Sequence, residues 1–126
     1  MSEEKKKIIL IIEDEIVHQR TLSQKLGMEG YETISAKNGE EGLALAIEKH
    51  PDLILLDLQM PKMNGIEMSK KLREDDWGKT AKIVVLTNVS DMGKLEEALN
   101  NDIVNYHIKT AIKIEDLVLK IKEMVE

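Results

Sequence analysis

Hydrophobic residues gather in five short runs along this chain, and the runs alternate with longer stretches that have a helical period. Residues 7–12, 52–56 and 82–87 are continuous apolar runs rich in leucine and β-branched side chains, as in strands that are covered on both faces. Residues 31–36 alternate between apolar and polar positions, which is typical of an edge strand, and residues 103–108 are a weaker run. The pattern therefore predicts five strands.

The stretches between these runs predict helices. Asn38 and Asn64 each stand three positions before a glutamate, which is the pattern of a capping box at the start of a helix. Residues 114–125 have the clearest apolar stripe in the chain, and residues 91–100 have a shorter one. A further helix is predicted at residues 15–28. Its expected inner face has three apolar members and one polar neighbour: Ile16, Leu22, Leu26 and Gln19.

Strands and helices thus alternate along the chain, an order that predicts an α/β fold with a parallel sheet and helices on both faces. Right-handed crossover connections make a doubly wound sheet the expected solution. The 126 residues are enough for one domain with a core and leave no room for a second. We expect a single domain over residues 1–126, with residues 1–6 as a flexible charged tail.

Charge and composition disfavour several classes of partner. The net charge is −6, whereas nucleic acids and anionic membranes are bound by basic surfaces. The chain has no phenylalanine, two tyrosines and one tryptophan, too few for a base-stacking platform. It has no cysteine, and no apolar run is long enough for a signal peptide or a membrane span. We expect a cytoplasmic protein that binds neither nucleic acid nor membrane.

Chemically active side chains stand at the ends of the predicted strands. Glu13 and Asp14 follow the first strand and Asp57 follows the third. Thr87 ends the fourth, and Lys109 follows the fifth. In a parallel sheet these ends share one edge, which is where doubly wound folds bind ligands. The sequence therefore predicts that three acids, a hydroxyl and an amine meet in one site.

The predicted site has the composition of a phosphoryl-transfer site. Two carboxylates about 4 Å apart repel each other by roughly 4 kcal/mol at an effective dielectric near 20. A hard divalent cation such as Mg²⁺ and the ammonium group of Lys109 would relieve this repulsion. Metal, ammonium and hydroxyl would then hold the oxygens of a phosphoryl group, and Asp57 would accept it.

Each of these residues also has a purely structural interpretation. Asp57 and Thr87 are of types common in turns and caps, and Lys109 alone is typical of a surface. Glu13 and Asp14 alone could belong to a solvated first helical turn, since acids favour helix N-termini. The functional hypothesis depends on their coincidence at separate strand ends.

The segments that contain these residues are DLILLDLQMPKMNG, ILIIEDE, VVLTN and YHIK. The first resembles the phosphoacceptor segment of the receiver domain of two-component response regulators almost letter for letter. The others resemble that family's acidic pair, its switch-threonine segment and its aromatic-x-x-Lys segment. The resemblance covers residues 7–125 and implies a flavodoxin-like, five-stranded parallel sheet of order 2-1-3-4-5, as in a stand-alone, chemotaxis-regulator-like receiver.

The resemblance also implies the roles of the acids. Asp57 would accept the phosphoryl group from the phosphohistidine of a histidine kinase or of a histidine phosphotransfer protein. Asp14, Asp57 and the backbone carbonyl of Gln59 would bind Mg²⁺ directly, and Glu13 would act through water. The protein would catalyse only its own phosphorylation and dephosphorylation, and would not be a metabolic enzyme.

The remaining site residues would make the switch. Thr87 and Lys109 would bond the phosphoryl group, and Tyr106 would be the switch aromatic that turns inward. Phosphorylation would then change the face made by the fourth helix, the fifth strand and the fifth helix, within residues 90–125. A downstream protein or a second copy of the chain would bind this face.

Three positions depart from the family pattern. Glu13 stands where aspartate is commoner, which lengthens one arm of the site. Asn88 stands where a very small residue is usual, so its bulk could slow phosphoryl exchange at Asp57. Thr110 follows Lys109 where the family usually has a proline in a cis peptide. A cis bond without proline costs about 2.5–4 kcal/mol, so we expect a trans bond here.

Two other functions stay open at this point. A pseudo-receiver, which keeps the fold as a phosphate-independent interaction module, would fit Asn88 and Thr110. A hydrolase with a strand-end aspartate nucleophile needs a second aspartate two residues on, where this chain has Gln59. His18 and His50 are interpreted as an exposed helical residue and a loop residue without a role in the site.

Overall fold

The computed structural model describes residues 6–57, 63, 65–87, 105–108 and 113–125. Its strands form one parallel sheet of order β2-β1-β3-β4-β5. The bounds are β1 Ile8–Ile12, β2 Glu32–Ala36, β3 Leu53–Asp57, β4 Ile83–Thr87 and β5 Asn105–Ile108. The predicted parallel sheet is confirmed for the first four strands, and the alternating run does form the edge strand β2. β5 pairs with β4 at the opposite edge.

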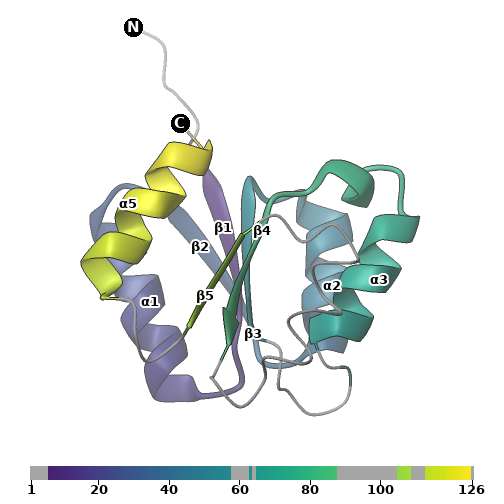
Figure 1. Ribbon diagram of the computed structural model, residues 1–126, viewed down its shortest axis with the longest axis horizontal. Helices are drawn as coiled ribbons and strands as arrows, with labels where there is room; N and C mark the ends of the chain where they lie inside the picture. The colour runs from purple at the N-terminus through teal and green to yellow at the C-terminus, as the bar shows by residue number, and fades with distance from the viewer. Residues whose placement is uncertain (1–5, 58–62, 64, 88–104, 109–112, 126) are drawn as a thin grey trace, which may run out of the picture.

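Four α-helices lie in the described part of the chain. They are α1 Ile16–Met28, α2 Gly39–Lys49, α3 Gly65–Glu74 and α5 Ile114–Val125, with a short 3₁₀ turn at Gly78–Thr80. α1 and α5 cover one face of the sheet, and α2 and α3 cover the other (Figure 1). The predicted helix at 91–100 lies outside the described residues. The layers are those of a doubly wound α/β fold.

The core consists of two apolar layers, one on each face of the sheet. Leu10 and Ile12 of β1 point toward α2 and α3, whereas Ile9 and Ile11 pack against α1 and α5. All five residues of β3 are buried. Because every second side chain faces the other layer, a strand in the middle of this sheet is apolar along its length, and β3 departs from this at its last residue, Asp57. This two-sided burial explains the continuous runs in the sequence.

The start of α2 is attached to the segment that follows β3. The side-chain oxygen of Asn38 accepts a hydrogen bond from the backbone N–H of Glu41 at 2.7 Å, so the predicted cap is present. The N–H of Gly39 donates to the carbonyl of Met63 at 3.1 Å. A Cβ at position 39 would overlap that carbonyl, so only glycine permits this approach.

α1 differs from its prediction at the first turn. Leu22 and Leu26 are buried as expected, but Ile16 is 58% exposed. Ile16 follows closely on the carboxyl end of β1, where the sheet no longer extends beneath the helix. Gln19, by contrast, is directed inward by hydrogen bonds to two backbone carbonyls at the strand ends.

An ion pair links the end of α1 to α5. The ammonium nitrogen of Lys122 lies 2.7 Å from a carboxylate oxygen of Glu29. The hydrogen bond and the charge of Lys122 lower the pKa of the Glu29 carboxyl below its ordinary value of 4.5.

The surroundings of two glycines predict that substitution by alanine has opposite effects on stability at Gly39 and at Gly27. Gly39→Ala should lower the free energy of unfolding by about 1–3 kcal/mol, because its Cβ meets a backbone carbonyl. Gly27→Ala is the matched control: it lies in α1 with open space around it, and should raise stability by roughly 0.5–1 kcal/mol. Urea unfolding of both variants tests this. A neutral Gly39→Ala would contradict the close approach.

The ion pair between Glu29 and Lys122 predicts a pH-dependent effect of Glu29→Gln. Because the carboxyl pKa is lowered in the folded state, the stabilisation is present above pH 4.5 and is lost as the pH falls through the folded-state pKa. Glu29→Gln should therefore lower the melting temperature at pH 7, and its effect should shrink as the pH is lowered toward 3. Glu123→Gln, which removes a 3.8 Å pair within α5, is the control. An equal effect of Glu29→Gln at both pH values would exclude an electrostatic cause.

Candidate functional site

Three carboxylates meet at the carboxyl edge of the sheet. β1 and β3 are paired directly, with Ile12 beside Leu56, so Glu13, which follows β1, and Asp57, the last residue of β3, are neighbours. One carboxylate oxygen from each of Glu13, Asp14 and Asp57 lies within 4.8 Å of the other two. The acids that the sequence placed at separate strand ends are therefore brought together.

The three acids differ in their exposure. Glu13 is 2% exposed and Asp57 is 6% exposed, whereas Asp14 is open to solvent. Buried carboxylates must be hydrogen-bonded or paired, because their desolvation is costly. The cluster thus concentrates negative charge at a partly buried point with one accessible carboxylate.

The first turns of α1 hold Glu13 in place. The ring nitrogen Nδ1 of His18 lies 2.7 Å from Oε1 of Glu13, and the backbone N–H of Glu15 donates to Oε2 at 3.2 Å. The side-chain amide of Gln19 donates to the carbonyl of Glu13 at 3.1 Å and to that of Ala36 at 3.3 Å. These contacts bind the ends of β1 and β2 to the helix.

The contacts of His18 correct the sequence interpretation. His18 was expected to be an exposed helical residue, but its side chain is 30% exposed and is bonded to a buried carboxylate. The sequence signal was the position of His18 and Gln19, five and six residues after Glu13, where one turn of helix returns to the strand end. A lone histidine beside a lone glutamine has no periodic pattern, so the sequence does not indicate this contact.

The other predicted site residues are placed only in part. Thr87 ends β4, one residue beyond Leu86, which pairs with Asp57, so its backbone lies at the same edge of the sheet. Tyr106 lies in β5 beside Val85. Four further residues lie outside the described part of the chain: Gln59, Asn88, Lys109 and Thr110. The peptide bond between Lys109 and Thr110, which is predicted to be trans, also lies outside it.

The donor set of the cluster fits a hard divalent cation. Carboxylate oxygens are the ligands that Mg²⁺ prefers, and a metal ion would compensate the mutual repulsion of the acids. Glu15 and His18 form a second group with Glu13, whose ligand atoms are equally close together. Glu13 belongs to both groups, so the orientation of its carboxylate determines with which group it could hold a cation.

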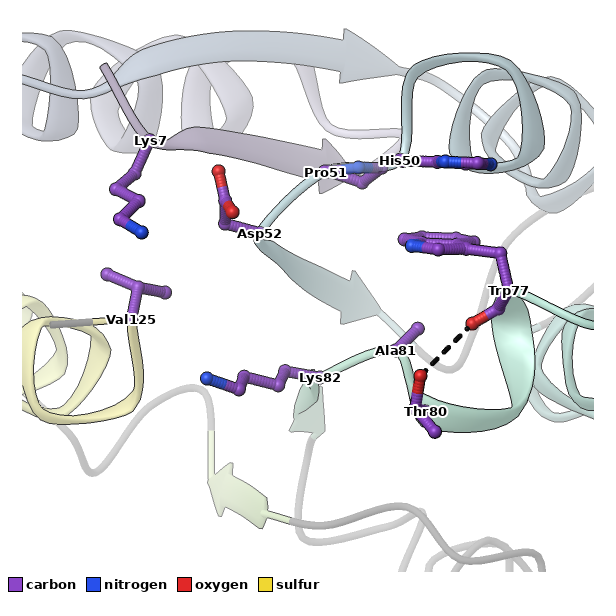
Figure 2. A pocket seen from close by; sticks show the side chains of 9 residues that line it. All are labelled: Lys7, His50, Pro51, Asp52, Trp77, Thr80, Ala81, Lys82 and Val125. Carbon is purple, nitrogen blue, oxygen red and sulfur yellow. Dashed lines mark hydrogen bonds between the residues drawn. The ribbon is translucent and has the colours of Figure 1, made fainter. Parts of the chain in front are cut away.

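A second recess lies at the amino ends of the strands, and stacked aromatic rings and lysines line it in place of clustered acids. His50 ends α2 in the left-handed conformation, at a φ of 47°, and its ring stacks on Trp77 with centroids 4.5 Å apart. Figure 2 shows this stack beside Lys7, Asp52 and Lys82 at the amino ends of the strands. The recess holds about 210 Å³, less than the roughly 300–1,000 Å³ of small-molecule sites. His50 lies in the loop after α2, as the sequence predicts, and its ring stacks on Trp77 there.

Comparisons with known proteins agree with this architecture. The family model of the response regulator receiver domain matches residues 9–122. The polar-differentiation response regulator DivK of Brucella anthropi is 33% identical over 116 residues, which span 92% of this chain and 94% of that protein. The similarity therefore extends over nearly the full length of both chains.

Solved structures show the same fold. A CheY-like receiver domain protein from Methanospirillum hungatei superposes with a TM-score of 0.88 at 30% identity, over 96% of this chain and 94% of that one. The receiver domain of the sensor histidine kinase PA1611 from Pseudomonas aeruginosa has a TM-score of 0.87 at 24% identity, over 96% and 98% of the chains. That structure is described with a magnesium ion coordinated in its active-site cleft. Among the described residues of the present chain, no helix is long and apolar enough to cross a membrane.

The crowded carboxylates predict that removing one of them stabilises the metal-free protein. Asp14→Asn removes one charge from the cluster, so it should raise the melting temperature in chelator-treated buffer by a few degrees, which corresponds to roughly 1 kcal/mol. Asp76→Asn makes the same change at a fully exposed carboxylate and should have little effect. A lower melting temperature for Asp14→Asn would contradict mutual repulsion as the dominant interaction.

Proposed function

The chain belongs to the response regulator receiver domain family, and on this premise we propose that it is a phosphorylatable signalling switch of a two-component system. The observation that carries the proposal is the meeting of Glu13, Asp14 and Asp57 within 4.8 Å at the carboxyl edge of the sheet. A pseudo-receiver without phosphate chemistry would gain nothing from the repulsion of these acids. We therefore favour the active switch.

Asp57 is the proposed phosphoacceptor. One of its carboxylate oxygens forms a bond to phosphorus while the N–P bond of a partner's phosphohistidine breaks, and the electron pair of that bond stays on the imidazole nitrogen. The donor is a histidine kinase or a histidine phosphotransfer protein. Hydrolysis of the resulting acyl phosphate returns the carboxylate and inorganic phosphate. The protein thus catalyses only its own phosphorylation and dephosphorylation. We propose that it is a cytoplasmic protein.

The proposed cofactor is Mg²⁺, held by Asp14, by Asp57 and by the backbone carbonyl of Gln59, with Glu13 acting through water. The exposure of Asp14 and the burial of Glu13 support this division of roles. When bound, the ion neutralises charge on the acids and on the phosphoryl oxygens. Ile12 and Leu56, which precede the acids in β1 and β3, are buried and exclude water from the interior side of the site.

Thr87, Lys109 and Tyr106 are the proposed switch residues. The end of β4 is adjacent to the end of β3, so Thr87 lies in the strand next to the acceptor. Thr87 and Lys109 would bond the phosphoryl group, and Tyr106 would follow the movement of Thr87. The helix that the sequence predicts at residues 91–100, outside the described part of the chain, would complete a (βα)₅ fold. The output face would consist of that helix, β5 and α5, and would bind a downstream protein or a second copy of the chain.

The proposal predicts a single phosphorylation site. Acetyl phosphate with Mg²⁺ should produce one hydroxylamine-labile phosphoryl adduct, located at Asp57 by mass spectrometry. Asp57→Asn should abolish it, because the proposal assigns the attack on phosphorus to Asp57 and assigns the neighbouring acids Glu13 and Asp14 to the cation. Asp52→Asn, at the amino end of the same strand, should label like the wild type.

Two results would contradict this assignment. An unlabelled wild-type protein would favour the pseudo-receiver, and labelling that persists in Asp57→Asn would move the acceptor elsewhere.

A further inference from the structure

A second group of metal-ligating side chains lies beside the acid cluster, where α1 begins. It consists of Glu13, Glu15 and His18, and we call it the His18 group. Each residue offers one ligand atom, and the three atoms lie within 4.8 Å of one another. Glu13 also belongs to the cluster with Asp14 and Asp57, whereas the proposed phosphoryl transfer assigns no role to Glu15 or His18.

The start of α1 brings the members of the His18 group together. Glu15 is the N-cap residue of α1, its side chain makes no capping hydrogen bond, and His18 follows in the first turn of the helix. Side chains three positions apart share one face of a helix. Glu13 comes directly after β1, and its Oε2 accepts the backbone N–H of Glu15 at 3.2 Å. The chain therefore places two carboxylates and an imidazole around one point.

The distances within the His18 group are close to those of a coordination sphere. Nδ1 of His18 lies 2.7 Å from Oε1 of Glu13. Two ligands of a tetrahedral Zn²⁺ ion, each bound at roughly 2.1 Å, lie roughly 3.4 Å apart. The separations in the structure, from 2.7 Å for this pair to at most 4.8 Å within the group, bracket that value. Small side-chain rotations are therefore sufficient to admit an ion.

The three side chains range from buried to exposed. Glu13 is 2% exposed, the His18 side chain is 30% exposed, and Glu15 is open to solvent. An ion can therefore approach past Glu15 and reach the buried carboxylate of Glu13. Water can complete the coordination on the exposed side, as it does in zinc sites with three protein ligands.

A purely structural interpretation explains only part of this group. A hydrogen bond between His18 and Glu13 needs those two side chains, but the carboxylate of Glu15 brings a second negative charge beside the first. The partial positive charge at the N-terminus of a helix is about half an elementary charge, so it offsets less than one of them. A divalent cation balances both.

The imidazole determines which cations fit. Mg²⁺ prefers oxygen ligands and keeps several waters, whereas imidazole suits Zn²⁺, Cu²⁺ and Ni²⁺. We propose that Glu13, Glu15 and His18 form a second cation site, selective for a divalent transition-metal ion such as Zn²⁺. This site shares Glu13 with the proposed Mg²⁺ site but does not depend on phosphoryl transfer. The chain thus has two adjacent cation sites of different chemistry.

Zinc binding at His18 is observed directly in the NMR signals of the histidine ring nitrogens. Zn²⁺ added to the full chain at fixed pH, in buffer with an excess of Mg²⁺, should move the signal of the coordinating His18 nitrogen. The ring signals of His50, which stacks on Trp77 at the amino ends of the strands, should stay in place. Spectra of His18→Ala and His50→Ala assign the signals.

Calorimetric titration with Zn²⁺ under the same conditions identifies the ligands. His18→Ala should weaken Zn²⁺ binding by at least about tenfold, since the loss even of an outer-shell partner of a metal ligand has an effect of that size. Glu15→Gln should weaken it by a smaller factor, because a neutral amide replaces a carboxylate. Glu40→Gln, which removes an acid from the first turn of α2, is the matched control and should keep the wild-type affinity. Thermal melts establish that each variant is folded.

Asp57→Asn separates the two cation sites. It removes a carboxylate of the proposed Mg²⁺ site but none of the His18 group. This variant should therefore bind Mg²⁺ more weakly than the wild type and still show the shift of the His18 nitrogen with Zn²⁺.

Three results would overturn the inference. They are an unchanged His18 ring signal in the presence of Zn²⁺, a wild-type Zn²⁺ affinity of folded His18→Ala, and loss of the His18 response in Asp57→Asn. The last result would mean that the ion belongs to the acid cluster. None of the three bears on the phosphoacceptor. Absence of labelling by acetyl phosphate would instead overturn the proposed function and leave the His18 group as a zinc site.

Discussion

The parallel pairing of β1 with β3 is the constraint on which the site depends. This pairing places Ile12 beside Leu56, so the next residues, Glu13 and Asp57, are also neighbours. Three carboxylates within 4.8 Å repel one another, so the edge of the sheet would separate if nothing held it. Burial of both faces of β1 and β3 supplies that force, since about 25 cal/mol is gained for each Å² of apolar surface removed from water.

Because apolar burial holds the sheet together, the apolar pattern of the sequence was informative about the architecture. Continuous apolar runs arise only where both faces of a strand are covered, and they indicate a parallel sheet with two helical layers. Parallel strands bring Asp57 and Glu13 to the same edge of the sheet, and the pairing of β1 with β3 makes them neighbours. The cap at Asn38 and the apolar stripe of α5 are local signals, and both correspond to observed features.

The sequence was less informative where a single contact decides the structure. His18 and Gln19 reach back to Glu13 because α1 starts close to the end of β1, and that relation depends on a loop of three residues rather than on any periodicity. Ile16 has the spacing of a core residue but lies beyond the sheet. His50 and Trp77 are far apart in the chain, and their stacking follows from the packing of α2 beside α3.

The hydrogen bonds of α1 connect the site to the helical layer. Gln19 joins the carbonyls of Glu13 and Ala36, and His18 holds the Glu13 side chain, so α1 and the acid cluster cannot move independently. A fold that depends on apolar pattern tolerates wide divergence, as the TM-score of 0.88 at 30% identity illustrates. The chemistry of one charged side chain is far less tolerant, because exchanging a single donor changes its orientation and its effective charge.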